Sequence, residues 1–176
     1  MQRHELEHLI RAAARITDEY DFVVVGSQSI LGSLQRPPAE CTMSDEADIF
    51  PMPAEDKADI IDGAIGEGSQ FHETYGYYAQ GVDSSTAILP AGWRDRLVRL
   101  QSAATDGRVA YCLDMLDLFL SKCAANREKD RVFNRALLVH GYVRVDDALV
   151  RLADMPLNHE RKAAIESLIR RLSTDA

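Results

Sequence analysis

The sequence predicts an α/β protein: a mixed sheet flanked by helices forms a core over residues 1–113, and a helical C-terminal subdomain follows over residues 114–176. Three observations predict this fold class. Strand-like and helical patterns alternate through the core, only helical patterns follow it, and 176 residues suffice for one domain with a sizeable hydrophobic core.

The first elements are a helix and a strand. Apolar residues at three- and four-residue intervals predict an amphipathic helix over residues 4–19. The β-branched run Asp21–Val25 predicts a buried strand, and Gly26–Ser27 a tight turn after it. Residues 28–34 suit one or two helical turns, which the prolines that follow must end.

The next strand carries two acids. Acidic and apolar residues alternate over residues 46–50, which predicts a strand with Glu46 and Asp48 on one face. Residues 54–65 predict a short helix whose first turn is acidic, as the helix dipole favours. A glycine cluster that starts at Gly63 is expected to close this helix.

The sequence predicts strands in the rest of the core. Residues 75–82 and 86–89 predict two strands around a turn at Asp83–Ser85, because Asp and Ser favour turns. Residues 97–100 and 109–113 predict two further strand pieces.

Only helices are predicted after residue 113. Asp114 is expected to cap a helix that runs to about Asn126, Asp146 a second helix and Asn158 a third, since Asp and Asn side chains accept hydrogen bonds from the first free N–H groups of a helix.

Composition excludes several classes of protein. No segment approaches the roughly 20 apolar residues that a membrane span requires, and the N-terminus has no apolar signal segment, so we expect no membrane partner and a cytoplasmic location. The three cysteines form no CxxC pair and are expected to be reduced.

The net charge of −8 opposes general attraction to nucleic acid. Any such contact needs a local basic patch, and one candidate comprises Arg94, Arg96, Arg99, Arg127, Lys129, Arg131 and Arg135.

The candidate site residues of the core are Gly26–Ser27 and the pair Glu46-x-Asp48. Two carboxylates on one strand face lie about 6 to 7 Å apart and repel each other, so Mg²⁺ or Mn²⁺ is their natural neutraliser. A Gly-Ser turn that opens a helix lets phosphate oxygens approach the backbone N–H groups. Together these residues predict a site for a metal and a nucleotide.

This pattern resembles the polymerase-beta-type nucleotidyltransferase superfamily, in which Gly-Ser precedes an [Asp/Glu]-x-[Asp/Glu] pair. The segments SDEADIFP, GVDSSTAILPAGWRDRL and LDLFLSKCAANREKD further resemble a bacterial nucleotidyltransferase-like family related to the AbiEii-type abortive-infection toxins. The sequence departs from the pattern in two ways: the spacer is longer, and the first acid is Glu46 rather than Asp.

The resemblance implies roles for residues in a nucleotidyltransferase-like core. Gly26 and Ser27 would hold the triphosphate of an NTP, and Glu46 and Asp48 would coordinate the metals. Asp83 is the best match for a third carboxylate, which activates the acceptor hydroxyl.

Two residues of the helical subdomain complete the implied site. Lys122 would contact the nucleotide phosphates. Asp130, eight residues later and expected on the same helical face, would position Lys122 or receive the nucleotide.

Purely structural interpretations compete with these roles. The two acids on the strand fit a solvated face, Gly26–Ser27 and Asp83–Ser85 fit ordinary turns, and Lys122 fits a side chain that extends from an apolar face to solvent.

The function expected from the resemblance is metal-dependent transfer of a nucleotidyl group from an NTP to an RNA or protein hydroxyl, as the toxin of a toxin-antitoxin pair with an antitoxin protein as partner. Three alternatives remain: a degenerate fold that binds only a nucleotide or a partner, a metal-dependent phosphohydrolase, and an antitoxin-like interaction protein.

Overall fold

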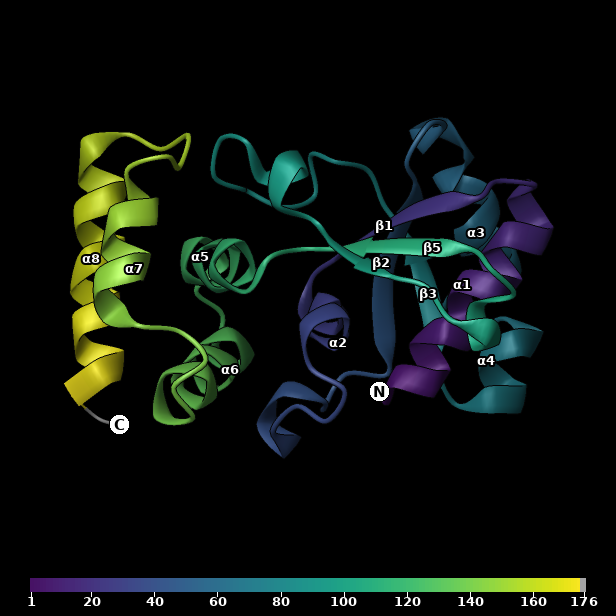
Figure 1. Ribbon diagram of the computed structural model, residues 1–176, viewed down its shortest axis with the longest axis horizontal. Helices are drawn as coiled ribbons and strands as arrows, with labels where there is room; N and C mark the ends of the chain where they lie inside the picture. Colours follow the sequence, from purple (N-terminus) through teal and green to yellow (C-terminus); the bar gives the residue numbers. More distant parts are fainter. Residues whose placement is uncertain (175–176) are drawn as a thin grey trace. The chain divides into compact units, whose positions relative to one another are not determined.

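The computed structural model describes residues 1–174 and contains a five-stranded mixed sheet in the order β3-β2-β1-β5-β4 (Figure 1). The strands are β1 Asp21–Val25, β2 Glu46–Pro51, β3 Tyr78–Gly81, β4 Val98–Leu100 and β5 Val109–Cys112. β1 pairs antiparallel with β2 and parallel with β5, β2 pairs parallel with β3, and β4 pairs antiparallel with β5. The predicted α/β class with a mixed sheet is confirmed.

The helices of the core are α1 Arg3–Thr17, α2 Ile30–Ser33, α3 Ala58–Ile65 and α4 Gln70–Tyr75. In the apolar stripe of α1, Leu6, Leu9, Ile10 and Ala13 are fully buried and Ile16 is half-buried. The helix ends at Thr17 because Asp18 adopts the left-handed conformation, with φ 57°. α1 and α3 lie together on one side of the sheet, and α2 packs on β4 and β5 from the other (Figure 1).

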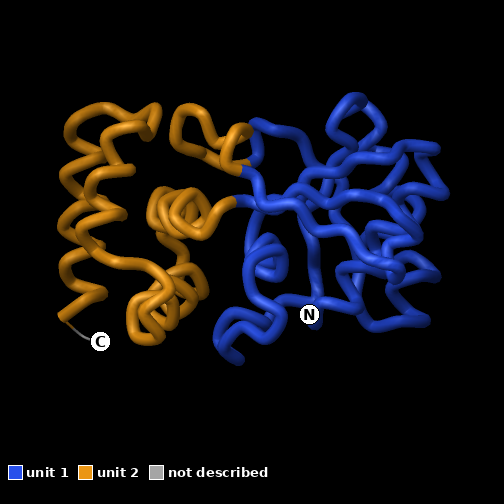
Figure 2. The backbone as a smooth tube through the Cα atoms, in the orientation of Figure 1, with its two compact units in different colours: residues 1–86, 97–113 blue, residues 87–96, 114–176 orange. Residues whose placement is uncertain are grey.

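The chain divides into two compact units (Figure 2). The first, which we call the core, comprises residues 1–86 and 97–113, and the second, the helical unit, comprises residues 87–96 and 114–176. Residues 87–96, which the sequence analysis places in the core, belong with the helical unit.

A buried carboxylate explains why residues 87–96 join the helical unit. Asp117 is fully buried and accepts two hydrogen bonds from Arg96, at 2.9 and 3.1 Å, and one from Arg151 at 2.7 Å. Arg96 also donates to the carbonyl of Ala91. Because a buried charge must be paired, this network fastens the segment to the helices.

The helices of this unit are α5 Met115–Ala125, α6 Glu128–Val139, α7 Val145–Leu152 and α8 His159–Thr174. The predicted caps Asp114 and Asn158 are confirmed, since each accepts a backbone N–H, at 3.1 and 2.9 Å. The cap at Asp146 is wrong: α7 starts at Val145, and Asp146 lies in its first turn, where the dipole favours an acid.

Two predicted elements of the core differ from the structure. Residues 86–89 form no strand, because the chain leaves the sheet for the helical unit at this point. Tyr75, where the predicted strand over residues 75–82 begins, is instead the last residue of α4, which Ser69 caps and Gly76, with φ 78°, ends. The predicted glycine cluster does close α3: Gly63 lies inside the helix, and Gly66 caps its end.

No helix among residues 1–174 is long and apolar enough to cross a membrane. All three cysteines are buried.

Candidate functional site

Gly26 packs directly against the carboxylate of Asp48. In the antiparallel pair of β1 and β2, Val25 lies opposite Asp48, so Gly26 leaves β1 beside that side chain. A Cβ on Gly26 would lie 2.0 Å from Oδ2 of Asp48. Gly26 also has φ 65° and ψ −161°, which residues with side chains rarely adopt. The position therefore requires glycine on two independent grounds.

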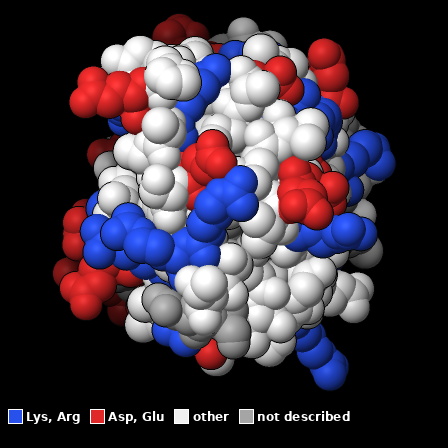
Figure 3. Space-filling view, turned by 90° about the vertical axis from the view of Figure 1, so that its left-hand side faces the viewer, with Lys and Arg blue, Asp and Glu red and all other residues white. Residues whose placement is uncertain are grey.

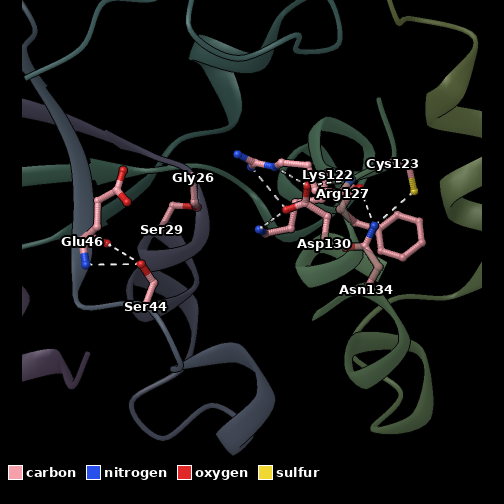
Figure 4. Close-up of polar contacts among 10 residues, drawn as sticks. Gly26, Ser29, Ser44, Glu46, Lys122, Cys123, Arg127, Asp130 and Asn134 are labelled. Carbon is pink, nitrogen blue, oxygen red and sulfur yellow. Dashed lines mark hydrogen bonds and ion pairs between the residues drawn. The ribbon is translucent and has the colours of Figure 1, made fainter. Parts of the chain in front are cut away.

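Glu46 and Asp48 lie on the same face of β2, as predicted, and both are half-buried. The backbone N–H of Glu46 donates to Oγ of Ser44 at 3.2 Å, which fixes the start of the strand (Figure 4). The side chain of Glu46 accepts a hydrogen bond from the hydroxyl of Tyr78 at 3.4 Å. The two residues are register partners in the parallel pair of β2 and β3.

Tyr78 is a neutral donor at physiological pH. Burial, followed by the negative charge of Glu46, raises the pKa of Tyr78 to about 12. The aromatic ring of His72 lies 4.6 Å from the Tyr78 ring, centroid to centroid, and Nδ1 of His72 accepts the N–H of Gly68 at 3.0 Å. The contacts from α4 thus hold the phenol that orients Glu46. Sequence analysis missed Tyr78, whose signal is its place one strand away from the acid pair.

The carboxylate oxygens of Glu46 and Asp48 suit a hard cation, provided that a nucleotide supplies further oxygen ligands. Within residues 1–174, no three His, Cys, Asp or Glu side chains come together as a metal site. Gln80, not an acid, is the register partner of Asp48 on β3. Mg²⁺ is commonly bound through one or two carboxylates plus substrate phosphates, so the pair Glu46 and Asp48 fits Mg²⁺ or Mn²⁺ in company with an NTP.

The turn after β1 is tied to the start of β2. Ser29 donates its backbone N–H and its hydroxyl to the carbonyl of Gly26, at 3.3 and 2.8 Å. Gln28 is fully buried, and its Nε2 donates to the carbonyl of Ser44 at 2.8 Å, while its Oε1 has no hydrogen-bond partner. The turn and the acid strand are therefore held together by Gln28, which sequence analysis did not single out.

The helix that follows the turn is short. A single 3-10 turn, Ser27–Ser29, leads into the four residues of α2. Because so short a helix has a small dipole, any attraction of phosphate must come from the local N–H groups and the Ser27 hydroxyl, as the sequence analysis expects.

Asp83 is exposed beyond the end of β3. Its carboxylate accepts the backbone N–H of Ser85 at 2.7 Å and the Ser85 hydroxyl at 2.5 Å, which lowers its pKa. It lines an open cavity of about 530 Å³ together with Glu55, Asp56 and Asp59. These contacts are those of a turn residue.

In the helical unit, Lys122 and Asp130 form a buried ion pair (Figure 4). Nζ of Lys122 lies 3.0 Å from Oδ1 of Asp130 and 4.3 Å from the centre of the Phe133 ring. Nε of Arg127 lies 2.7 Å from Oδ2 of Asp130. Burial alone would raise the pKa of Asp130, but hydrogen bonds from Arg127 and Lys122 lower it below its ordinary value.

The predicted pairing of Lys122 and Asp130 is correct, but the predicted geometry is wrong. Asn126 adopts the left-handed conformation, with φ 51°, and ends α5, so Asp130 lies on α6 rather than on the same helix. The interpretation of Lys122 as a solvent-reaching side chain is also wrong, because only 6% of that side chain is exposed. A contact between Lys122 and nucleotide phosphates stays a prediction.

A family model described as nucleotidyltransferase of unknown function (DUF6036) matches residues 4–153, which include the core from residue 4 onward and the helical unit through α7. No curated protein and no solved structure matches the chain.

Proposed function

The chain belongs to this family of nucleotidyltransferases of unknown function, and from that premise we propose that its core transfers a nucleotidyl group from an NTP to a hydroxyl of RNA or protein. The observation that carries the proposal is the contact between Gly26 and Asp48. It joins a turn open to phosphate directly to one carboxylate of the acid pair.

Each residue of the core has a role in this proposal. Glu46 and Asp48 would hold Mg²⁺ or Mn²⁺, which, when bound, stabilises the negative charge that develops on the α-phosphate. Gly26 leaves room for the Asp48 carboxylate beside the turn, the Ser27 hydroxyl would bind the phosphate oxygens, and Tyr78 would orient Glu46. The acceptor oxygen forms a bond to the α-phosphorus as the bond to the β-phosphate breaks and pyrophosphate leaves.

Two residues named in the sequence analysis have less support. Asp83 is assigned no step, because its carboxylate is engaged by Ser85. For Lys122 the substitution Lys122→Met is decisive: a phosphate contact predicts NTP affinity about ten- to a hundredfold weaker, whereas a buried structural pair predicts unchanged affinity.

The test is incubation of the protein with each labelled NTP, Mg²⁺, and total cellular RNA and protein. We expect label in RNA or in protein, and none with Asp48→Asn. Release of labelled pyrophosphate without an adduct would instead indicate a phosphohydrolase. Growth arrest on expression, relieved by a co-expressed neighbouring gene, tests the toxin role.

A degenerate nucleotide-binding protein is the second candidate. It is favoured by Gln80, which stands beside Asp48 where a third carboxylate would complete the acid set. Magnesium-dependent binding of NTP without transfer to any acceptor would select this function.

A further inference from the structure

A small cationic cavity lies in the helical unit, where α5 ends, α6 begins and α8 ends. It has a volume of about 280 Å³ and is lined by Asn126, Arg131, Leu168, Arg171 and Leu172. No carboxylate is among these lining residues. The cavity is independent of the core residues to which the proposed function is assigned.

The two arginines have hydrogen-bond donors to spare. Arg131 donates from Nε to Oδ1 of Asn126 at 2.8 Å and from Nη2 to the Asn126 carbonyl at 3.3 Å. A guanidinium has five N–H donors, so three remain. Within residues 1–174, neither Arg131 nor Arg171 pairs with a carboxylate, in contrast to Arg170, which pairs with Glu166 at 2.8 Å.

The surroundings strengthen attraction to an anion. Leu168 and Leu172 are 7% and 9% exposed and form an apolar floor, beside which electrostatic interactions are stronger than in water. Two guanidiniums that share a cavity repel each other, and an anion between them removes that repulsion. Lys and Arg side chains gather in a band on the side of the molecule drawn in Figure 3.

We propose that this cavity binds the phosphate group of a ligand. The forked donors of arginine match the oxygens of phosphate, and the Asn126 amide adds a neutral polar group. A volume below the usual range of pockets for whole small molecules suits a phosphate group rather than an entire nucleotide. The group belongs to free phosphate, to a phosphomonoester or to the backbone of a nucleic acid strand.

The family match stops at residue 153, before α8 supplies Arg171. The phosphate site is therefore a property of this chain that goes beyond the proposed function.

The experiment titrates the full chain with potassium phosphate, with potassium chloride of equal ionic strength as reference. The guanidinium Nε–H resonances of Arg170 and Arg171 are followed by NMR. We expect a saturable shift at Arg171 and none at Arg170, its paired neighbour on the same helix. Calorimetry should show that Arg171→Gln weakens this binding about ten- to a hundredfold and that Arg170→Gln leaves it unchanged.

The melting temperatures of the two variants establish that both fold. Absence of a saturable shift at Arg171, or equal losses for the two variants, overturns the proposal. A short oligoribonucleotide without a terminal phosphate identifies the source. If it displaces phosphate from Arg171, the site binds a nucleic acid backbone, and if it does not, the site binds free phosphate or a phosphomonoester.

Discussion

Gly26 shows how one residue can link the fold to the chemistry. Gly26→Ala places a methyl group 2.0 Å from Oδ2 of Asp48 and imposes a side chain at φ 65°. We expect loss of NTP binding and a free energy of unfolding lower by about 1 kcal/mol or more, because the new residue fits neither the space nor the backbone conformation.

The control is Gly63→Ala, since nothing lies within 4 Å of that position in α3. It should stabilise the protein by up to about 1 kcal/mol, as alanine does within helices, and leave NTP binding intact. Urea unfolding and calorimetric titration of NTP with Mg²⁺ measure both quantities. Unchanged NTP affinity in Gly26→Ala would remove the turn from the site.

Tyr78 provides a second test at the residue scale. Tyr78→Phe removes the hydroxyl that donates to Glu46 and keeps the ring. We expect affinity for Mn²⁺ in the presence of NTP to fall about tenfold, because loss of a group that orients a metal ligand commonly has an effect of that size. Excess Mn²⁺ should restore activity.

Tyr77→Phe is the matched control, since the Tyr77 hydroxyl bonds instead to Nδ1 of His8 at 2.8 Å. If both substitutions weaken the binding of Mn²⁺ equally, the orienting role of Tyr78 is wrong.

At the scale of elements, strand β2 and the end of α5 near Asn126 were predicted from the sequence, whereas α6, which follows directly, was not. The alternation around Glu46 and Asp48 is a local pattern with a period of two, so the sequence alone predicts their shared face. Residues 115–139 favour helix almost throughout, so only Asn126, which tolerates the left-handed conformation, marks the break. The pair Lys122 and Asp130 forms across this break.

Removal of one partner of that pair should be costly. Asp130→Asn removes the carboxylate that Nζ of the buried Lys122 contacts at 3.0 Å, and we expect the free energy of unfolding to fall by about 3 kcal/mol. The double variant Lys122→Met with Asp130→Asn should recover part of this loss. Urea unfolding at neutral pH measures both, and equal stability of single and double variants would contradict the role of the pair.

The same pair sets a pH dependence. Because the pKa of Asp130 is lowered in the folded state, its stabilising effect is complete above the ordinary pKa of Asp and is lost as the pH falls through the lowered value. The free energy of unfolding of Asp130→Asn should therefore fall less than that of the wild type between neutral and acidic pH. Urea unfolding at a series of pH values measures this difference.

At the scale of the whole molecule, the division into two units depends on contacts that no local pattern reveals. Residues 87–96 look like part of the core by sequence, yet Arg96 pairs with Asp117, twenty-one positions later. The spacing of apolar residues along the sequence does not show which residues pair over such a separation. The apolar run around Ile88 and Leu89 was therefore wrongly predicted to be a strand. The candidate site in the core was accessible to sequence reasoning because both of its halves lie at strand ends.

Ligand binding to the core should be visible in the unfolding of the whole chain. Under the proposed function, NTP with Mg²⁺ would bind only the folded core and should stabilise the protein by about 2.7 kcal/mol at one hundred times Kd, whereas either alone should do less. Asp48→Asn removes a carboxylate that the proposed metal site requires, so the stabilisation by NTP with Mg²⁺ should disappear. Asp83→Asn removes a carboxylate that stabilises a turn, so this variant should keep that stabilisation.

Calorimetry shows whether the core and the helical unit unfold together. The shift in melting temperature caused by NTP with Mg²⁺ should appear in the transition of the core. If Asp83→Asn abolishes the shift and Asp48→Asn retains it, the metal site lies at the end of β3 rather than on β2.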